Sequence, residues 1–408
     1  MELERALSRH SLRAASWALL LGNFVIGCGV MVMAGTLNDL THDLHVTVSE
    51  GGRLIAVAAV MMGVGAPLLA WRVAQMDRRK LLTWALLWYA AGHLLSALAP
   101  DYHWLMPVRA LTVLSAAVFT PQAAATAGFM STPAHRGRAI TFVFMGWSIA
   151  SVAGMPLSAW IGERLGWRVA MAGVGVAALV AAFLVHRALP HGIRTPALSL
   201  RSWGKVLRSP LLMALVFVTA CQSAGQFTVL AYAAPYYRQV FGASPEQISL
   251  MFAWFGALAL TGNVVLNRMV DRVGAAPAVS LTLGMMAVSL LLWPLAGSLP
   301  ALALVLLPWA LSGFATNSGQ QARLGGLSPR LAPALMALNT SAIYTGHALG
   351  ASGGGWVIAH QGYAPLHWPA LAWMLLALAL SLWAQRVQRR QEARRASRLG
   401  LDGADGAP

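Results

Sequence analysis

The sequence predicts an all-α membrane protein in which twelve transmembrane helices form two pseudo-symmetric bundles of six. About a dozen apolar stretches are each roughly 20 residues long, which is enough for a helix to cross a bilayer. The basic residues fall almost entirely in alternate gaps between these stretches. A weak internal repeat, offset by 197 residues, aligns one half of the chain with the other.

Composition excludes a soluble protein. Of 408 residues, 58% are hydrophobic and 10% are charged, and the mean hydropathy is +0.62. A net charge of +16 is compatible with nucleic-acid binding, but the basic residues lie in short loops beside predicted spans, where they set orientation. Because no soluble basic domain exists to present them, we expect the lipid bilayer, and not nucleic acid, to be the partner.

The apolar stretches place six spans in each half of the chain. In order along the first half they are 15–37, 53–72, 81–99, 105–128, 139–161 and 168–187. In the second half they are 210–233, 248–268, 276–297, 300–321, 334–358 and 367–387. The even number predicts that both termini lie on the same side of the membrane.

Charge asymmetry predicts the orientation. With the N-terminus inside, 24 of the 29 Lys and Arg residues face the cytoplasm. The five exceptions are Arg53, Arg109, Arg164, Arg168 and Arg238. This bias predicts a multi-pass protein of the bacterial inner membrane with both termini cytoplasmic.

The longest internal polar stretch divides the chain. It carries five basic residues and two prolines, Pro190 and Pro196. We therefore expect an N-terminal bundle over 1–187, a cytoplasmic linker over 188–209, a C-terminal bundle over 210–387 and a cytoplasmic tail over 388–408. Two parallel six-span halves are typical of a transporter in which one half rocks against the other around a central site.

Four segments resemble a known family. They are the loop Asn267-Arg-Met-Val-Asp-Arg-Val-Gly274 with its weaker partner at 70–80, Arg109 in span four, Gly146-Trp-Ser-Ile-Ala-Ser-Val-Ala-Gly154-Met-Pro156 in span five, and Gly166-Trp-Arg168. Together they resemble the major facilitator superfamily, in its twelve-span drug:proton antiporter branch, and most closely the arabinose-efflux-permease-like bacterial exporters. The resemblance covers about residues 15–387.

This resemblance implies several gating and coupling roles. Asp271, Arg272 and Gly274 match the family's cytoplasmic gating loop, in which the carboxylate caps helix ends and pairs with arginine across the halves. Arg109 matches the family's intramembrane arginine. Two departures weaken the match: Ala74 replaces the aspartate of the first gating loop, and span one lacks the acidic residue that many relatives carry there.

Spans five and eleven are rich in small residues. Small residues let helices approach closely, and here they are Gly154 in span five and Gly346, Gly350 and Gly353 in span eleven. Pro156 in span five bends its helix. We expect these spans to be rocking surfaces between the halves. Plain tight packing is the alternative for any single glycine.

In the fold that the resemblance implies, spans one, four, seven and ten line the substrate cavity. Their polar and aromatic residues are Asn23, Asn38, Phe119, Gln122, Gln222, Gln226, Tyr232, Trp309 and Asn317. Gln222 and Gln226 are four residues apart and so project from one helix face. Such a cavity favours a neutral polar-aromatic or amphipathic small molecule.

Coupling residues are scarce, because no carboxylate falls mid-membrane. Arg109 is the first candidate for a coupling residue, because a charge inside the membrane is costly. Alternatively, Arg109 has a structural role and extends its side chain to the outer interface. His347 and His93 are the titratable residues at depth, and histidine can change charge near neutral pH. For His93 a structural role is favoured, whereas for His347 both roles stay open.

No motif for enzyme chemistry, a cofactor or a metal is present. We therefore predict a secondary active transporter that exports a small organic molecule by alternating access, with proton antiport as the expected coupling. An uncoupled facilitator and a non-transporting membrane sensor are the alternatives. A monomer suffices for this architecture.

Overall fold

The computed structural model describes residues 9–402 except 74, 133–135, 195–199 and 328–330, and within these ranges every regular element is helical. The first half contains, in chain order, α2 (Arg9–Gly35), α3 (Leu37–Asp43), α4 (Val48–Val73), α5 (Arg78–Ala97), α6 (Tyr102–Phe129), α7 (Arg136–Ile149), the π-helical turn η1 (Ala150–Gly154), α8 (Met155–Leu165) and α9 (Trp167–Ala188).

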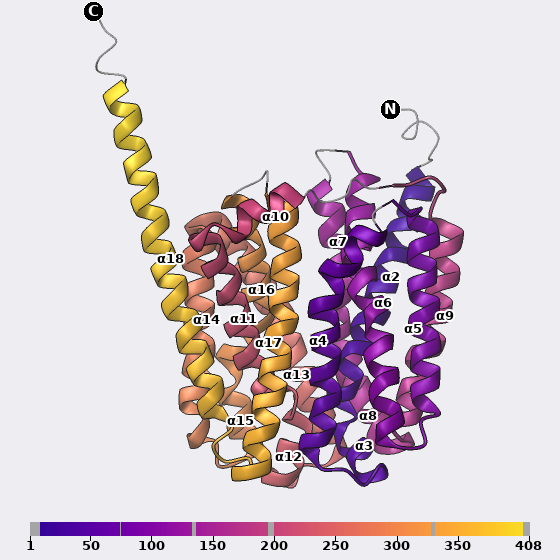
Figure 1. Cartoon of the computed structure of the whole chain (residues 1–408). Helices are drawn as coiled ribbons and strands as arrows, with labels where there is room; N and C mark the ends of the chain where they lie inside the picture. The colour runs from indigo at the N-terminus through magenta and orange to yellow at the C-terminus, as the bar shows by residue number, and fades with distance from the viewer. Residues whose placement is uncertain (1–8, 74, 133–135, 195–199, 328–330, 403–408) are drawn as a thin grey trace, which may run out of the picture.

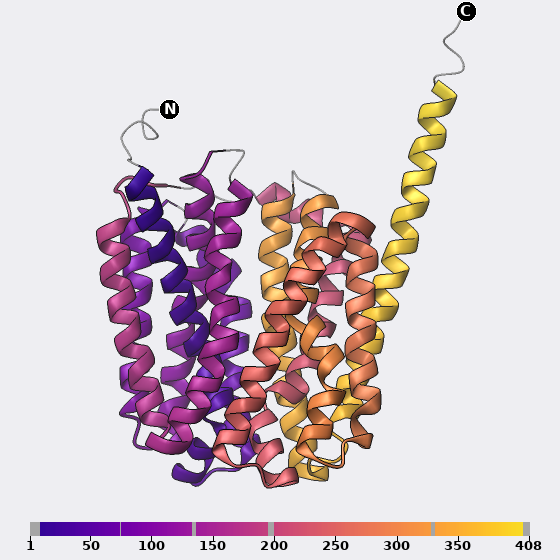
Figure 2. The same ribbon diagram turned by 180° about the vertical axis from the view of Figure 1, so that it is seen from behind.

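The second half repeats this pattern after a short helix in the predicted linker, α10 (Leu200–Leu207). It contains α11 (Pro210–Leu230), α12 (Ala233–Phe241), α13 (Pro245–Val273), α14 (Ala275–Leu292), the 3₁₀ turn η2 (Trp293–Leu295), α15 (Leu299–Val305), α16 (Leu307–Leu327), α17 (Ala332–Gln361) and α18 (His367–Asp402). The two halves stand side by side in both views (Figures 1 and 2).

The two ends of the molecule differ in the segments that they hold. Helix α2 begins and α18 ends at the same end, which we call the terminal end (Figure 1). Helices α3 and α12 lie at the opposite end, which we call the distal end. This arrangement agrees with an even number of crossings.

Most predicted spans correspond to one long helix. Among the described residues nine helices are long and apolar enough to cross a membrane, or ten if α15 and α16, which meet at 46°, form one bent span. Helices α5 and α17 occupy the remaining two predicted spans. The twelve-helix all-α fold is therefore confirmed.

Local sequence signals explain where helices begin and turn. Asp77 and Asp101 cap α5 and α6, accepting backbone N–H bonds from Lys80 (3.1 Å) and Trp104 (2.8 Å). Gly166, at φ +93°, allows the chain to pass from α8 directly into α9, a conformation that L side chains rarely adopt.

The proline of span five produces an irregular helix. Pro156 lies at the start of α8, immediately after η1, whose residues form a π-helical turn. Because proline lacks an N–H and crowds the preceding turn, a local change of helix type is the expected response. The bulge lies at the contact with the other half, where a Cβ on Gly256 of α13 would lie 2.6 Å from Cα of Val152.

The halves meet along two seams. Helix α4 packs against α17, and η1 and α8 pack against α13. The glycines of α17, however, face α11 in their own half: a Cβ on Gly346 or Gly350 would lie 2.3 Å from the carbonyl oxygen of Ala220 or Ala224. For both glycines these contacts support tight packing within one half, and not a rocking surface between the halves.

Candidate substrate cavity and gate

The amide of Asn23 fastens three helices of the first half together. Its Nδ2 donates to the carbonyl of Val143 (3.0 Å), and its Oδ1 accepts from the hydroxyl of Thr120 (2.8 Å). Trp147 Nε1 donates to the same hydroxyl (3.4 Å). Asn23 is fully buried, and both ends of its amide are hydrogen-bonded. Its polar atoms are therefore used within the protein.

The two predicted cavity residues of α6 differ in exposure. Phe119 is buried and faces α2, where a Cβ on Gly22 would lie 2.4 Å from its ring. Gln122, one turn on, is half-buried. Only Gln122 of this pair presents a polar group at a partly open position.

The amides of the second half form a chain along α11. The hydroxyl of Ser223 donates to Oε1 of Gln222 (3.5 Å), and Nε2 of Gln222 donates to Oε1 of Gln226 (2.9 Å). All three side chains are buried. The four-residue spacing thus places the two glutamines together, as expected, but Nε2 of Gln226 has no hydrogen-bond partner among the described residues.

Two residues of α16 also have unpaired polar atoms. Trp309 is buried against Phe255 and Trp293, each with its ring centroid 6.2 Å away, and its Nε1 has no acceptor in the part of the chain that the structure describes. Asn317 is half-buried, and its Oδ1 likewise has no donor within the described ranges. The second half therefore brings Gln226, Trp309 and Asn317 to one pair of helices, α11 and α16, with hydrogen-bonding capacity left over.

Arg109 is a buried cation with neutral partners. Its Nη2 donates to the carbonyls of Gly29 (2.9 Å) and Val30 (3.3 Å) on α2, and its Nη1 lies 3.3 Å from Nε2 of His93. Since the arginine can only donate, Nε2 of His93 is the acceptor and Nδ1 donates to the carbonyl of Tyr89 (3.0 Å). Both ring nitrogens of His93 are thus engaged within the protein, and its structural role stays a prediction.

His347 has aromatic neighbours. Its ring stacks on Phe227 of α11 at 3.5 Å between centroids and meets Tyr344 edge-on at 5.6 Å. The residue is half-buried, and no hydrogen bond to its ring nitrogens is present among the described residues. It therefore combines a titratable ring with partial access.

A carboxylate links the halves at the distal end. Glu163, at the end of α8, is only 6% exposed; it accepts from Nδ2 of Asn38 (3.0 Å) and from Nη2 of Arg238 on α12 (2.6 Å). Next to it, Arg164 forms an ion pair with Glu246 of α13. We call Glu163, Arg164, Arg238 and Glu246 the distal latch, because each of its ion pairs joins one half to the other.

Tyr232 fills the junction beside this latch. It lies at the break between α11 and α12, is fully buried, and donates its hydroxyl to the carbonyl of Ala351 (2.6 Å). A Cβ on Gly52 of α4 would lie 1.9 Å from that hydroxyl, and one on Gly355 of α17 would lie 2.4 Å away. Tyr232 and Asn38 thus lie with the distal contacts between the halves.

The small-residue motif of span five makes contacts both within the first half and with the second half. A Cβ on Gly154 would lie 2.6 Å from Sγ of Cys28 in α2, within the first half. The carbonyl of Pro156 accepts a hydrogen bond from the hydroxyl of Ser249 on α13 (3.1 Å), across the halves. The side chain of Ser249 thus adds a third link between the halves, through the backbone of Pro156.

The terminal-end loops have a different arrangement. The carboxylate of Asp77 accepts from the backbone N–H of Gly192 (2.5 Å), which ties the loop after α4 to the linker. Burial alone raises the pKa of Asp77. Hydrogen bonds from the backbone N–H groups of Gly192, Lys80 and Arg79 together lower the pKa by more than burial raises it, so the pKa of Asp77 lies below its ordinary value.

The second gating loop lies at the same end. Gly274, at φ +86°, ends α13, and Arg272 in the last turn is exposed. The side chain of Asp271 lies outside the described residues, so its predicted pairing stays a prediction.

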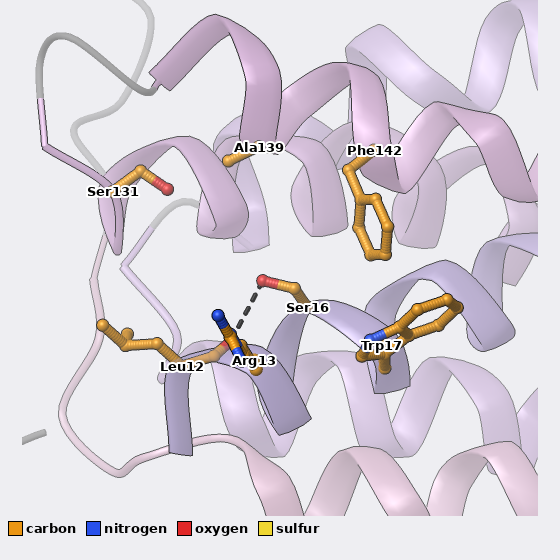
Figure 3. A pocket seen from close by; sticks show the side chains of 7 residues that line it. All are labelled: Leu12, Arg13, Ser16, Trp17, Ser131, Ala139 and Phe142. Atoms are coloured by element: carbon orange, nitrogen blue, oxygen red, sulfur yellow. Dashed lines mark hydrogen bonds between the residues drawn. The ribbon is translucent and has the colours of Figure 1, made fainter. Parts of the chain in front are cut away.

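A hollow of about 510 Å³ opens between α2, the end of α6 and the start of α7 at the terminal end (Figure 3). Trp17 and Phe142 meet edge-on in its wall at 4.9 Å, and Ser16 donates to the carbonyl of Leu12 (3.0 Å). No residue predicted for the cavity lines it. Among the described residues, no group of three or more His, Cys, Asp or Glu side chains is placed to hold a metal ion.

Sequence reasoning missed the distal latch. The signal that could have found it is the set of basic residues that break the charge asymmetry. Of the five, Arg164 and Arg238 pair across the halves, and Arg168 pairs with Asp43 within the first half. Three of the five therefore have a specific acidic partner, which topology alone does not identify.

Comparisons with known proteins agree with this architecture. The family model described as "Major Facilitator Superfamily" matches residues 19–236 and 215–401. The inner membrane transport protein YdhP of Escherichia coli (strain K12) is 28% identical over 379 residues, covering 92% of this chain and 96% of YdhP. The uncharacterized MFS-type transporter YbcL of Bacillus subtilis (strain 168) is 24% identical over 376 residues, covering 92% of this chain and 96% of YbcL.

Solved structures are similar in fold at low sequence identity. A bacterial homologue of the human lysosomal transporter Spinster, in an inward-facing and occupied conformation, has a TM-score of 0.73 at 16% identity and covers 93% of this chain and 98% of its own. A D-xylose-proton symporter has a TM-score of 0.72 at 18% identity, with coverages of 91% and 96%. With two six-helix halves, cross-half seams and a family match over nearly its whole length, the chain belongs to the Major Facilitator Superfamily and is a multi-pass membrane transporter.

Proposed function

We propose that this transporter exports a small organic molecule across the bacterial inner membrane by alternating access. The observation that carries the proposal is the distal latch, together with the bond from Ser249 to Pro156: these side-chain links join the halves at one end of the molecule. Alternating access requires such contacts to break when that end opens.

The proposal also assigns each end of the molecule to one side of the membrane. Because 24 of the 29 basic residues lie on the side of the termini, the terminal end is cytoplasmic and the distal end periplasmic. The latch therefore closes the periplasmic side in this conformation. Export, as opposed to import, rests on the resemblance of span five and the gating loops to the drug:proton antiporter branch.

Proton antiport is the coupling we propose. His347 is its candidate carrier, because the ring is titratable, partly accessible and free of hydrogen bonds among the described residues. An uncoupled facilitator is the second candidate, and Arg109 favours it: carbonyl groups and His93 surround this cation, where a proton-exchanging carboxylate would be expected.

One assay separates these functions. In inverted membrane vesicles that respire, a proton gradient quenches acridine orange, and a transported compound that exchanges with protons restores the fluorescence. We expect restoration by members of a panel of nucleosides, sugars, amino-acid derivatives and antibiotics, only when the protein is present. Flux without restoration would support the facilitator, and binding without flux would support a sensor.

A further inference from the structure

The hollow between α2, the end of α6 and the start of α7 lies where these helices enter the membrane (Figure 3). The membrane-spanning segment of α2 begins at Leu12, that of α7 begins at Phe142, and that of α6 ends at Phe129. Each of these limits either lines the hollow, whose volume is about 510 Å³, or lies two residues from Ser131, which lines it. The hollow therefore opens at the boundary between hydrocarbon and water at the terminal end.

Polar and aromatic side chains line different parts of this hollow. Figure 3 shows the rings of Trp17 and Phe142 together on one side, in edge-on contact at 4.9 Å, with Ser131 and Arg13 toward the other. Trp17, which is 60% exposed, follows the exposed Arg13 by four residues and so lies about 6 Å deeper along the helix axis. A cation above an aromatic surface matches a phospholipid, whose phosphate lies above its glycerol and acyl chains.

The polar groups of the hollow have complementary hydrogen-bonding capacity left. Among the described residues, the guanidinium of Arg13 has no hydrogen-bond or ion-pair partner, and a guanidinium can only donate. The hydroxyls of Ser16 and Ser131 donate to the carbonyls of Leu12 (3.0 Å) and Ala127 (2.8 Å), so their oxygens are left as acceptors. The hollow therefore offers donors to an anion and two acceptors to hydroxyl groups.

The helices that form the hollow carry positive charge only. Their sequences contain neither Asp nor Glu, and α2 and α7 each begin with an arginine, Arg9 and Arg136. Basic pockets between membrane-spanning helices attract anionic headgroups, whereas the ammonium group of a zwitterionic headgroup would be repelled by the same charges. The charge therefore favours a headgroup that has a phosphate and no ammonium.

We propose that this hollow binds an anionic phospholipid whose headgroup carries hydroxyl groups, of the phosphatidylglycerol type. Arg13 binds the phosphate, with the geometry in which a guanidinium donates two parallel hydrogen bonds. The oxygens of Ser16 and Ser131 accept from the headgroup hydroxyls, and the rings of Trp17 and Phe142 contact the glycerol and the first part of the acyl chains. The bound lipid joins α2, α6 and α7 at the terminal end, and its site does not depend on the proposed transport function.

The test uses lipids that share their acyl chains and differ in the headgroup. Native mass spectrometry of the full chain in detergent gives the dissociation constant of the first bound lipid for dioleoyl phosphatidylglycerol, phosphatidylmethanol and phosphatidylcholine. We expect phosphatidylglycerol to bind at least about fivefold more tightly than phosphatidylcholine, the ratio that one basic residue beside an anionic lipid supplies. Phosphatidylmethanol, which has the same charge without the hydroxyls, should lie between them. Free glycerol phosphate should not displace the lipid, because it lacks the chains that contact Trp17 and Phe142.

Two variants locate the lipid in the hollow. Arg13→Gln should remove the preference of the protein for phosphatidylglycerol over phosphatidylcholine. Ser16→Ala combined with Ser131→Ala should make phosphatidylglycerol and phosphatidylmethanol bind equally while both stay tighter than phosphatidylcholine. Arg187→Gln is the matched control and should retain every preference: Arg187 is exposed in the last turn of α9, and its guanidinium lies 5.4 Å from the ring centroid of Phe183, outside the hollow.

Four results would overturn the inference. They are equal binding of the three lipids to the wild-type protein, displacement of the lipid by free glycerol phosphate, equal losses in Arg13→Gln and Arg187→Gln, and a preference for phosphatidylglycerol over phosphatidylmethanol that survives in the serine variant. None of these results bears on alternating access, which the acridine orange assay tests separately.

Discussion

Single residues divide the polar interior of this transporter into two kinds of group. Asn23 uses both ends of its amide within the first half, whereas Gln226 and Trp309 keep donors unpaired in the second. The first kind stabilises the helix packing, whereas a buried donor of the second kind lowers stability for as long as it stays unpaired. From the sequence we predicted that all three residues line the cavity, because the sequence does not show which partner a polar side chain in a span bonds.

His347 is the residue whose substitution tests proton coupling. In His347→Ala we expect the pH dependence of substrate flux between pH 6 and 8 to disappear, because the titratable ring is gone, while equilibrium binding of ligand remains. The measurement is flux in proteoliposomes at matched internal and external pH. His360→Ala, at the exposed end of α17, is the control and should behave as wild type. A pH profile that survives in His347→Ala would remove this residue as the carrier.

At the scale of elements, glycine spacing determines how α17 packs on α11. Gly346 and Gly350 approach the carbonyls of Ala220 and Ala224 one turn apart, so the helices are in contact through backbone. The four-residue spacing predicted close packing from sequence. It could not indicate which neighbour is packed against, since span eleven also touches α4 in the other half.

Gly350→Ala tests this packing. Its methyl group would lie 2.3 Å from the Ala224 carbonyl oxygen, so the helices must separate, and we expect a loss of about 1–3 kcal/mol in the free energy of unfolding. Denaturant titration in mixed micelles measures it. Gly353→Ala, on the same helix but with nothing within 4 Å of its Cβ, should be near neutral. Equal effects of the two changes would contradict the packing described here.

Helix α3 anchors the turn between α8 and α9. The carboxylate of Asp43 accepts from Nε1 of Trp167 (2.9 Å) and pairs with Arg168. These contacts, the Trp167 hydrogen bond first, hold the pKa of Asp43 below its ordinary value. The Gly166-Trp-Arg168 turn was identified in the sequence, but its acidic partner on α3 was not, because pairing between residues so far apart in the chain depends on the tertiary fold.

This anchor predicts a pH effect on stability. A carboxylate with a depressed folded pKa contributes stability fully above its unfolded pKa, about 4, and loses that contribution as the pH falls through the folded value. We therefore expect Asp43→Asn to lower the melting temperature at pH 6 and to differ less from wild type near pH 3. A difference that stays constant over this range would show that Asp43 contributes no charge-dependent stability.

At the scale of the whole molecule, the sequence predicted the twelve-helix fold and the family, because apolar length and charge asymmetry are properties of individual segments. It did not predict the break of α11 at Tyr232 or the ion pair between Glu163 and Arg238. Both depend on how the halves meet, and the two ion-paired residues are 75 positions apart. The cavity residues Asn38 and Tyr232 accordingly lie among the distal contacts, where their predicted contact with substrate stays a prediction.

In the proposed mechanism, alternating access depends on the distal latch as a gate that opens. Glu163→Gln weakens the pair with Arg238 but retains the bond to Asn38. Because Arg238 is partly exposed, we expect a cost to the closed state of about 1–2 kcal/mol, which is roughly a 5–30-fold shift toward a distal-open state. Glu50→Gln, at the same end but with side-chain bonds, among the described residues, only to Thr47 of its own half, is the control.

The most direct measurement is the distance between spin labels at Leu98→Cys and Leu295→Cys, two exposed positions at the distal end, one in each half, with both native cysteines replaced by alanine. Double electron–electron resonance on the protein in lipid nanodiscs should show a longer-distance population that grows in Glu163→Gln and not in Glu50→Gln. A distance distribution that is identical in all three proteins would contradict the gate, and with it alternating access through this end of the molecule.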